Sequence, residues 1–68
     1  MRYVVVFAEG YVGYFFDEAS KVFDNREEAE AYAEKLNMEF AVANRCRVED
    51  LGDYYEVVDV EEYKKYEE

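Results

Sequence analysis

The sequence predicts an α+β fold, a small antiparallel sheet of about three strands in the order β-β-α-β with one long amphipathic helix packed on one face. Residues 3–8 and 54–60 are rich in valine and aromatic residues, which favour strands. Between them, apolar residues recur at helical spacing over about four turns. The 68 residues form a single small domain, near the lower size limit for a chain that folds alone.

The first predicted strand is the unbroken apolar run Tyr3–Ala8. Such a run suggests a central strand with neighbours on both sides, or a strand with one face covered by a partner. The next segment leaves two alternatives. Either residues 11–16 form the second strand of a tight hairpin, or residues 9–19 form a loop and residues 20–23 are the second strand. The two glycines of this segment accept backbone angles closed to other residues, which slightly favours the loop.

The predicted helix begins after a capping residue, Asp24 or Asn25, with a glutamate three residues later to complete a capping box. Its apolar stripe consists of Ala29, Tyr32, Ala33, Leu36, Phe40 and Ala43. We expect Asn44 to take the left-handed conformation that ends a helix. A competing interpretation ends the helix at Asn37 and makes residues 40–48 a strand, but the alanines of this stretch favour the helix.

After the helix, residues 48–52 are typical of one short helical turn closed by glycine, and residues 54–60 of a strand. The acidic tail, residues 61–68, is expected to be a frayed helical turn or disordered. A favourable pair between Glu61 and Lys65 would add only a few tenths of a kcal/mol to such a turn.

A single helix leaves one face of the predicted sheet without cover. Side chains of a strand alternate, so Tyr3, Val5 and Phe7 point one way, and Val4, Val6 and Ala8 point the other. The second set would form a large exposed apolar patch unless something buries it. We therefore expect a homodimer or an obligate partner.

The chain is strongly acidic, with 18 acidic and 8 basic residues, no histidine and a net charge of −10. Such a charge favours basic partners and disfavours direct binding to nucleic acid or to an anionic membrane. Without histidine, the chain lacks the usual proton shuttle near neutral pH, and a Ser-His-Asp or Cys-His site within one chain is excluded. We expect a protein that is not an enzyme and uses no cofactor.

Cys46 is the only cysteine, so no internal disulfide can form, and a reducing cytoplasm is the expected compartment. Tyr3–Ala8 is too short for the apolar core of a signal peptide, and no apolar stretch approaches membrane-spanning length. Arg45 and Arg47 could lower the pKa of the Cys46 thiol. Alternate residues of an extended chain point away from each other, however, and a half-buried structural cysteine is expected.

The exposed acids form the first candidate binding surface, consisting of Glu27, Glu30, Glu34, Glu49, Asp50 and Asp53. Acids one helical turn apart lie about 6 Å from each other, a spacing comparable to that of phosphates along a nucleic-acid strand. The functional hypothesis is a nucleic-acid mimic that blocks a basic groove, with fast, salt-sensitive association. The alternative, which we favour for the acids alone, is a solvated face that aids solubility. The last three acids could also hold a hard cation, but their spacing lacks the ligand set of an EF-hand, and no metal is expected.

The second candidate is the aromatic segment from Gly10 to Phe16. If it is a loop, Tyr11, Tyr14 and Phe15 are candidate anchors for a partner, because aromatic side chains dominate binding hot spots. The alternative, which the composition favours slightly, is an ordinary strand or a segment that supplements a small core.

Residues 23–37, followed by residues 53–58, resemble short acidic proteins of bacteriophages, mobile elements and their bacterial hosts. This group includes host-takeover factors and anti-CRISPR-type inhibitors that act as acidic decoys. The resemblance implies a phage-type inhibitor that binds a basic nucleic-acid-handling protein, such as a nuclease or a CRISPR effector. It assigns no role to any residue. The alternative function is an accessory or structural homodimer whose charge serves solubility.

Overall fold

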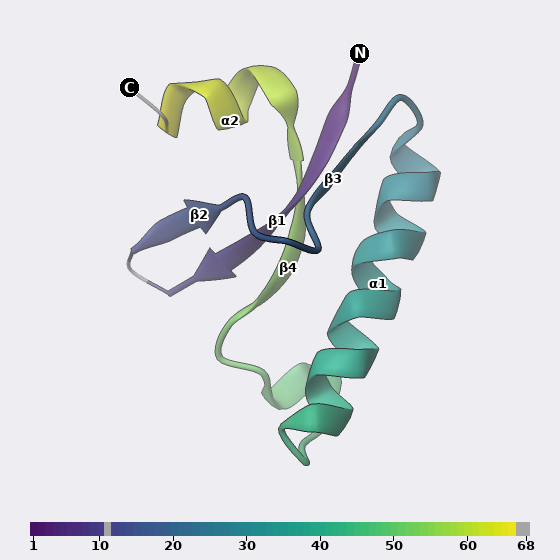
Figure 1. The fold of residues 1–68 in the computed structure, drawn as a ribbon, viewed down its shortest axis with the longest axis vertical. Helices are drawn as coiled ribbons and strands as arrows, with labels where there is room; N and C mark the ends of the chain where they lie inside the picture. Colours follow the sequence, from purple (N-terminus) through teal and green to yellow (C-terminus); the bar gives the residue numbers. More distant parts are fainter. Residues whose placement is uncertain (11, 67–68) are drawn as a thin grey trace.

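A computed structural model of the chain describes residues 1–10 and 12–66. In this part of the chain, four strands form one antiparallel sheet, accompanied by two α-helices and one short 3-10 helix (Figure 1). The long helix α1 (Arg26–Ala43) lies against one face of the sheet. The predicted α+β class is therefore confirmed. The observed order, β-β-β-α-β-α, has one strand and one helix more than predicted.

The central strand is β1 (Tyr3–Glu9), as its apolar run predicts. On one side it pairs with β4 (Tyr54–Asp59) along almost its whole length. On the other side its first half pairs with β3 (Lys21–Phe23) and its second half with β2 (Gly13–Phe15). Val4–Val6 are only 2, 0 and 0% exposed, which explains why this strand shows no polar alternation.

Both alternatives for the second strand contribute a short strand, because β1 is long enough to pair with two partners end to end. The loop prediction for residues 9–19 is thus wrong at β2. Gly10 turns the hairpin with φ 24°, a conformation that side chains disfavour. The connection from β2 to β3 is closed by Asp17, whose Oδ1 accepts hydrogen bonds from the backbone N–H of Ala19 and of Ser20 at 3.0 and 3.1 Å.

Helix α1 begins where the sequence predicts. Of the two candidate capping residues, Asn25 has the role, and its Oδ1 accepts the backbone N–H of Glu28 at 3.1 Å. The helix continues through residue 43, so the competing strand at residues 40–48 does not form.

The end of α1 differs from the prediction. Asn44 has φ −94°, and Arg45 takes the left-handed conformation instead, with φ 55°. The backbone N–H of Arg45 donates to the Val42 carbonyl at 3.1 Å, and that of Cys46 to the Ala41 carbonyl at 3.0 Å. These two bonds form a Schellman motif, which places the left-handed residue one position after the expected one.

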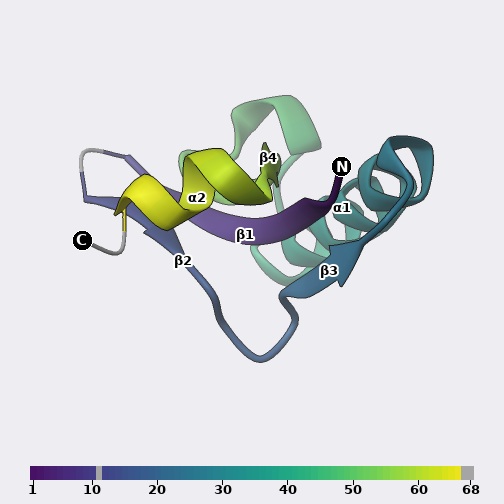
Figure 2. The same ribbon diagram turned by 90° about the horizontal axis from the view of Figure 1, so that it is seen from above.

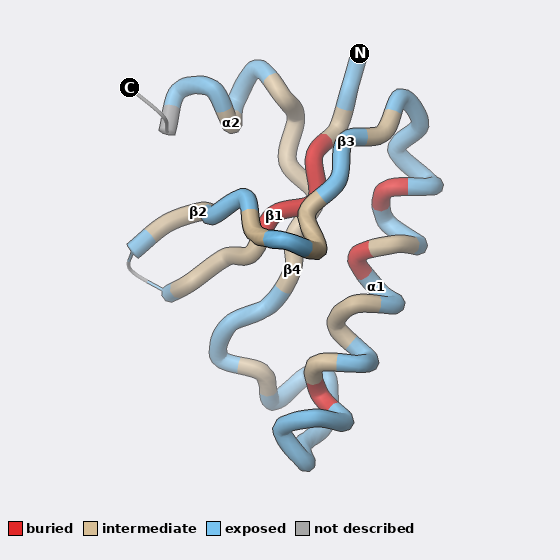
Figure 3. The backbone as a smooth tube through the Cα atoms, viewed as in Figure 1, coloured by how far each residue is buried: buried red, intermediate tan, exposed pale blue. Residues whose placement is uncertain are grey.

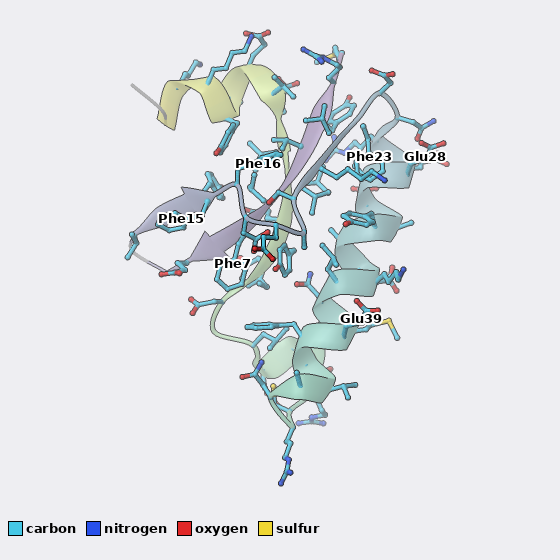
Figure 4. All side chains as sticks on the ribbon, viewed as in Figure 1. Phe7, Phe15, Phe16, Phe23, Glu28 and Glu39 are labelled. Carbon is cyan, nitrogen blue, oxygen red and sulfur yellow. The ribbon has the colours of Figure 1, made fainter. Side chains whose placement is uncertain are left out.

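The core lies between α1 and the sheet. Ala29 and Ala33 are 0 and 6% exposed, and their small side chains let the helix approach Val5, which is fully buried. Figure 3 shows these buried positions facing one another across β1 and α1. Phe23 lies between β3 and α1 (Figure 4), with its ring centroid 5.3 Å from that of Tyr32. The partly buried residues around this cluster are Tyr3, Phe23, Tyr32, Leu36, Tyr55 and Val57.

The C-terminal part contains the short 3-10 helix η1 (Val48–Asp50), as predicted, and then β4. Helix α2 (Val60–Tyr66) follows β4 directly and contacts β1, β2 and β4. The tail is therefore a packed helix rather than a frayed or disordered segment up to residue 66, and residues 67–68 lie outside the described residues. The pairs that form in α2 are Lys64–Glu61 and Lys65–Glu62 rather than Glu61–Lys65.

Helix α2 covers the face of the sheet that was expected to be open. Figures 1 and 2 show α1 and α2 on opposite sides of β1. Val4 and Val6 point away from Val5 and α1, and yet they are buried. Val60 and Tyr63, one helical turn apart, are half-buried in α2. The face from which a dimer was predicted is therefore covered within the chain, and the homodimer stays a prediction.

Candidate partner-binding surface

The acids of α1 are positioned by the regular helix that Asn25 caps. Glu27, Glu30 and Glu34 are all exposed, as predicted. Glu28 also points away from the sheet (Figure 4) and, with Glu27, lies in the first turn, where the positive end of the helix dipole stabilises carboxylates.

One cation accompanies this row of acids. Arg26 Nε lies 3.4 Å from Glu30 Oε2, and both side chains are more than half exposed. An exposed pair of this kind contributes about 0–1 kcal/mol to stability. Within the described residues, Glu27 and Glu34 take part in no ion pair. Their charges are therefore open to a partner's cations.

A groove of about 450 Å³ runs between α1 and β4. Its lining residues are Arg26, Glu30, Ala33, Glu34, Asn37, Val48, Tyr54, Tyr55, Glu56 and Val57. Two of the predicted acids, Glu30 and Glu34, thus share this groove. Glu56 of β4 also lines it, but Glu56 pairs with Val6, so its side chain belongs to the face of the sheet away from α1.

The second group of predicted acids does not join this groove. Glu49 and Asp50 are exposed on η1, and Asp50 Oδ2 lies 3.3 Å from Arg47 Nε. Asp53 lies beside the hairpin turn, with its Oδ1 4.0 Å from the point that a Cβ atom would occupy if Gly10 carried a side chain. The structure therefore separates the six predicted acids into a groove pair, a helix-tip residue and a group near the loops.

Residues 13–15 of the aromatic segment form strand β2, and Gly10 and Val12 lie in the turn that precedes it. Tyr11 lies outside the described residues. Tyr14 is half-buried opposite Ala8, and Phe15 is 42% exposed opposite Phe7. Phe16, just past β2, is 54% exposed. Strand pairing holds Tyr14 and Phe15 in place, so they form part of a sheet edge and not a mobile aromatic loop.

Cys46 also differs from expectation, because it is an exposed free thiol and not half-buried. It follows the left-handed Arg45 at the helix end, and that turn leaves its side chain outside the core. The neighbouring Arg47 is paired with Asp50.

Two tyrosine hydroxyls fasten the loop between β2 and β3. Tyr55 of β4 donates to Asp17 Oδ2 at 2.8 Å, and Tyr32 of α1 donates to the Ala19 carbonyl, also at 2.8 Å. Burial, then the hydrogen bond to Asp17 and the charge of that carboxylate, raise the pKa of Tyr55 to about 12. This polar cluster ties three elements together and has a structural role.

The amide of Asn37 makes the most specific polar contact along the groove. Its Nδ2 donates to the Tyr55 carbonyl at 2.9 Å, and its Oδ1 accepts the Tyr55 backbone N–H at 2.6 Å. From the sequence, Asn37 is only a possible helix end, since no local pattern marks a side chain that forms hydrogen bonds with a strand residue eighteen positions away.

The described residues contain no group of three potential ligands placed to hold a metal ion. No helix among residues 1–10 and 12–66 has the length and hydropathy needed to cross a bilayer. Comparison with protein-family models, with curated proteins and with solved structures found no match.

Proposed function

We propose that this protein is a small acidic inhibitor that occupies a basic surface of a nucleic-acid-handling protein, such as a nuclease or a CRISPR effector, by electrostatic mimicry. The observation that supports it most is the exposed row of α1 acids, Glu27, Glu30 and Glu34, of which Glu30 alone has an ion pair within the described residues. Carboxylates about 6 Å apart on a rigid helix present charge at a spacing close to that of phosphates. The phage type of inhibitor is the form that the sequence resemblance implies, acting in the cytoplasm of a host cell.

Rigidity supports the proposal as well. The helix is held against the sheet by a fully buried core at Val5 and Ala29, so the backbone positions from which its acids extend are fixed before binding. Preorganised charges lose little conformational freedom on association. A flexible acidic tail of equal charge would lose more.

The test begins with capture from the lysate of a bacterial host at low salt, elution by a salt gradient, and identification of each eluted protein by mass spectrometry. The captured protein is then purified, and its binding to labelled DNA or RNA is measured with and without the acidic chain. We expect competition, and an affinity for the acidic chain that falls steeply as salt rises. Capture without competition, or an affinity indifferent to salt, would contradict the mimicry.

Matched variants distinguish the contribution of this surface to binding from the contribution of net charge. Glu27→Lys/Glu34→Lys and Glu18→Lys/Glu39→Lys change the charge equally, and all four positions are exposed. We expect the first pair to weaken binding at least about tenfold more than the second, equivalent to about 1.4 kcal/mol. Equal losses would mean that only total charge matters.

The second candidate function is an accessory or structural homodimer, also without enzymatic activity. The observation that favours it is the exposure of three large apolar residues, Val12, Phe16 and Val22, at 71, 54 and 43%. Sedimentation at several concentrations decides it. A dimer that survives high salt would favour this function, and a monomer at every concentration would exclude it.

A further inference from the structure

Strand β4 forms an open edge of the sheet, since within the described residues it pairs with β1 alone. The bonds from Asn37 show which backbone groups point outward, because they reach both the N–H and the C=O of Tyr55. Tyr55, Val57 and Asp59 alternate along β4, opposite Phe7, Val5 and Tyr3. In an antiparallel pair, alternate residues direct their backbone groups to the same side. Val57 therefore also presents its backbone groups to the open edge.

The Asn37 side chain provides the Tyr55 backbone with the hydrogen-bond donor and acceptor that a neighbouring strand would otherwise provide. Among the described residues, no comparable side chain reaches the backbone N–H or C=O of Val57, which lines the same groove. An open donor and acceptor pair at a strand edge is a template for pairing with another chain. Asn37 protects one such pair and leaves the next one accessible.

The groove beside Val57 selects for a cationic occupant. Glu30 and Glu34 line it from α1, and the one cation of the lining, Arg26, is paired with Glu30. A second copy of the chain would bring two such acidic groups together, each on a protein of net charge −10. Like charges placed across an edge oppose that pairing. A positively charged strand meets no such repulsion.

We propose that the groove between β4 and α1 receives an extended segment of the partner protein, which adds a strand at Val57 and directs lysine or arginine side chains toward Glu30 and Glu34. Alternate residues of a strand are about 6.6 Å apart, and carboxylates one helical turn apart are separated by about 6 Å. A segment with a basic residue at every second position therefore matches the two glutamates. This inference rests on the proposed function and specifies how the partner is held.

The probe is a capped heptapeptide of alternating lysine and valine, titrated into the ¹⁵N-labelled full chain at low salt. A second peptide has the same sequence with N-methyl groups on alternate backbone nitrogens, which keeps its charge and removes its strand-pairing donors. We expect the first peptide to shift the amide signals of residues 55–59 and to slow hydrogen exchange at the Val57 N–H. The methylated peptide should bind at least about tenfold more weakly, since it cannot form the backbone bonds.

Matched variants test the side-chain contacts. Glu30→Gln/Glu34→Gln should weaken binding of the first peptide at least about fivefold more than Glu28→Gln/Glu39→Gln, which removes equal charge outside the groove. Circular dichroism confirms that each variant folds. Equal effects of the two pairs would overturn the assignment of the groove.

Other outcomes distinguish a failure of this inference from a failure of the proposed function. If both peptides bind equally, strand addition is wrong and the acidic decoy stands. If neither peptide binds but the chain still competes with nucleic acid for a captured protein, the assignment of the groove is wrong, and the proposed function is unaffected. If neither binding nor competition is seen, the proposed function fails too. Exchange at Val57 that slows with protein concentration, without peptide, would assign the edge to a second copy and overturn the basic partner.

Discussion

Replacing Tyr55 with phenylalanine removes one hydroxyl from a partly buried site while keeping the ring. That ring contacts Phe7, with centroids 5.1 Å apart, and Phe40, at 6.4 Å. The hydroxyl donates to Asp17 at 2.8 Å and so joins β4 to the loop between β2 and β3. The variant therefore tests that single link.

The expected loss follows from the geometry. A hydrogen bond to a charged group contributes about 1.5–3 kcal/mol to stability. Asp17 still accepts bonds from the Ala19 and Ser20 backbone and from Ser20 Oγ, so it is not left unpaired. The site is also partly exposed, and solvent screening weakens the interaction. We expect a loss of about 1–2 kcal/mol, which for this chain length lowers the melting temperature by about 5–15 °C.

The pH dependence gives a second signature. The pKa of Tyr55 rises from 10.0 to about 12 on folding, so between these values the folded state holds a proton that the unfolded state has lost. The stabilisation is fully present below pH 10 and is lost as pH rises toward about 12. A pKa difference of about two units corresponds to a change in the free energy of unfolding of at most about 2.7 kcal/mol, and solvent screening reduces this figure.

Urea unfolding of the wild type and of Tyr55→Phe at pH 7, 9, 10.5 and 11.5 measures both effects. The control is Tyr54→Phe, since Tyr54 is the neighbouring strand residue and is 42% exposed. We expect the stability difference between wild type and Tyr55→Phe to shrink above pH 10, and the control to stay near wild type. A difference that is absent at pH 7, or constant through pH 11.5, would refute the role of this hydroxyl.

Two further predictions concern the elements that sequence analysis misjudged. Arg45→Gly should stabilise the protein by about 1 kcal/mol, because glycine takes the left-handed conformation without strain; an unchanged or lower urea midpoint would contradict this. Deleting residues 60–68 should uncover Val4 and Val6 and cost about 2–4 kcal/mol, with association at higher protein concentration. Urea unfolding and sedimentation measure these effects, and a monomer of unchanged stability would show that α2 does not cover this face.

The elements predicted correctly are those whose signals are local. The valine run indicates that β1 is the central strand. The capping residue Asn25 and the periodic alanines indicate where α1 begins and which of its faces is buried. The left-handed residue after α1 is different. Asn44 has the better intrinsic preference, but two backbone bonds at the helix end assign the conformation to Arg45. The conformational preference of a single residue contributes less to stability than the two hydrogen bonds that satisfy the carbonyls at the helix end.

The candidate site shows the same division. Helical periodicity predicts that Glu27, Glu30 and Glu34 are exposed, but it does not show that two of them line a groove beside β4. That proximity depends on the position of β4 beside α1, which the topology determines. Asn37 carries no local signal for its bonds to Tyr55, because an isolated asparagine within a helix is more typical of an exposed position or a helix end.

The position of α2 changes how the two functions should be weighed. An exposed sheet face would have favoured association through apolar contacts, with weak dependence on salt. Because Val4 and Val6 are already buried within the chain, a partner would meet charged side chains and the open edge of β4 rather than an apolar sheet face. Association through such a surface should depend on salt and on backbone hydrogen bonds. These features favour the proposed basic partner over the proposed homodimer, and the salt dependence of association is the measurement that best distinguishes the two proposals.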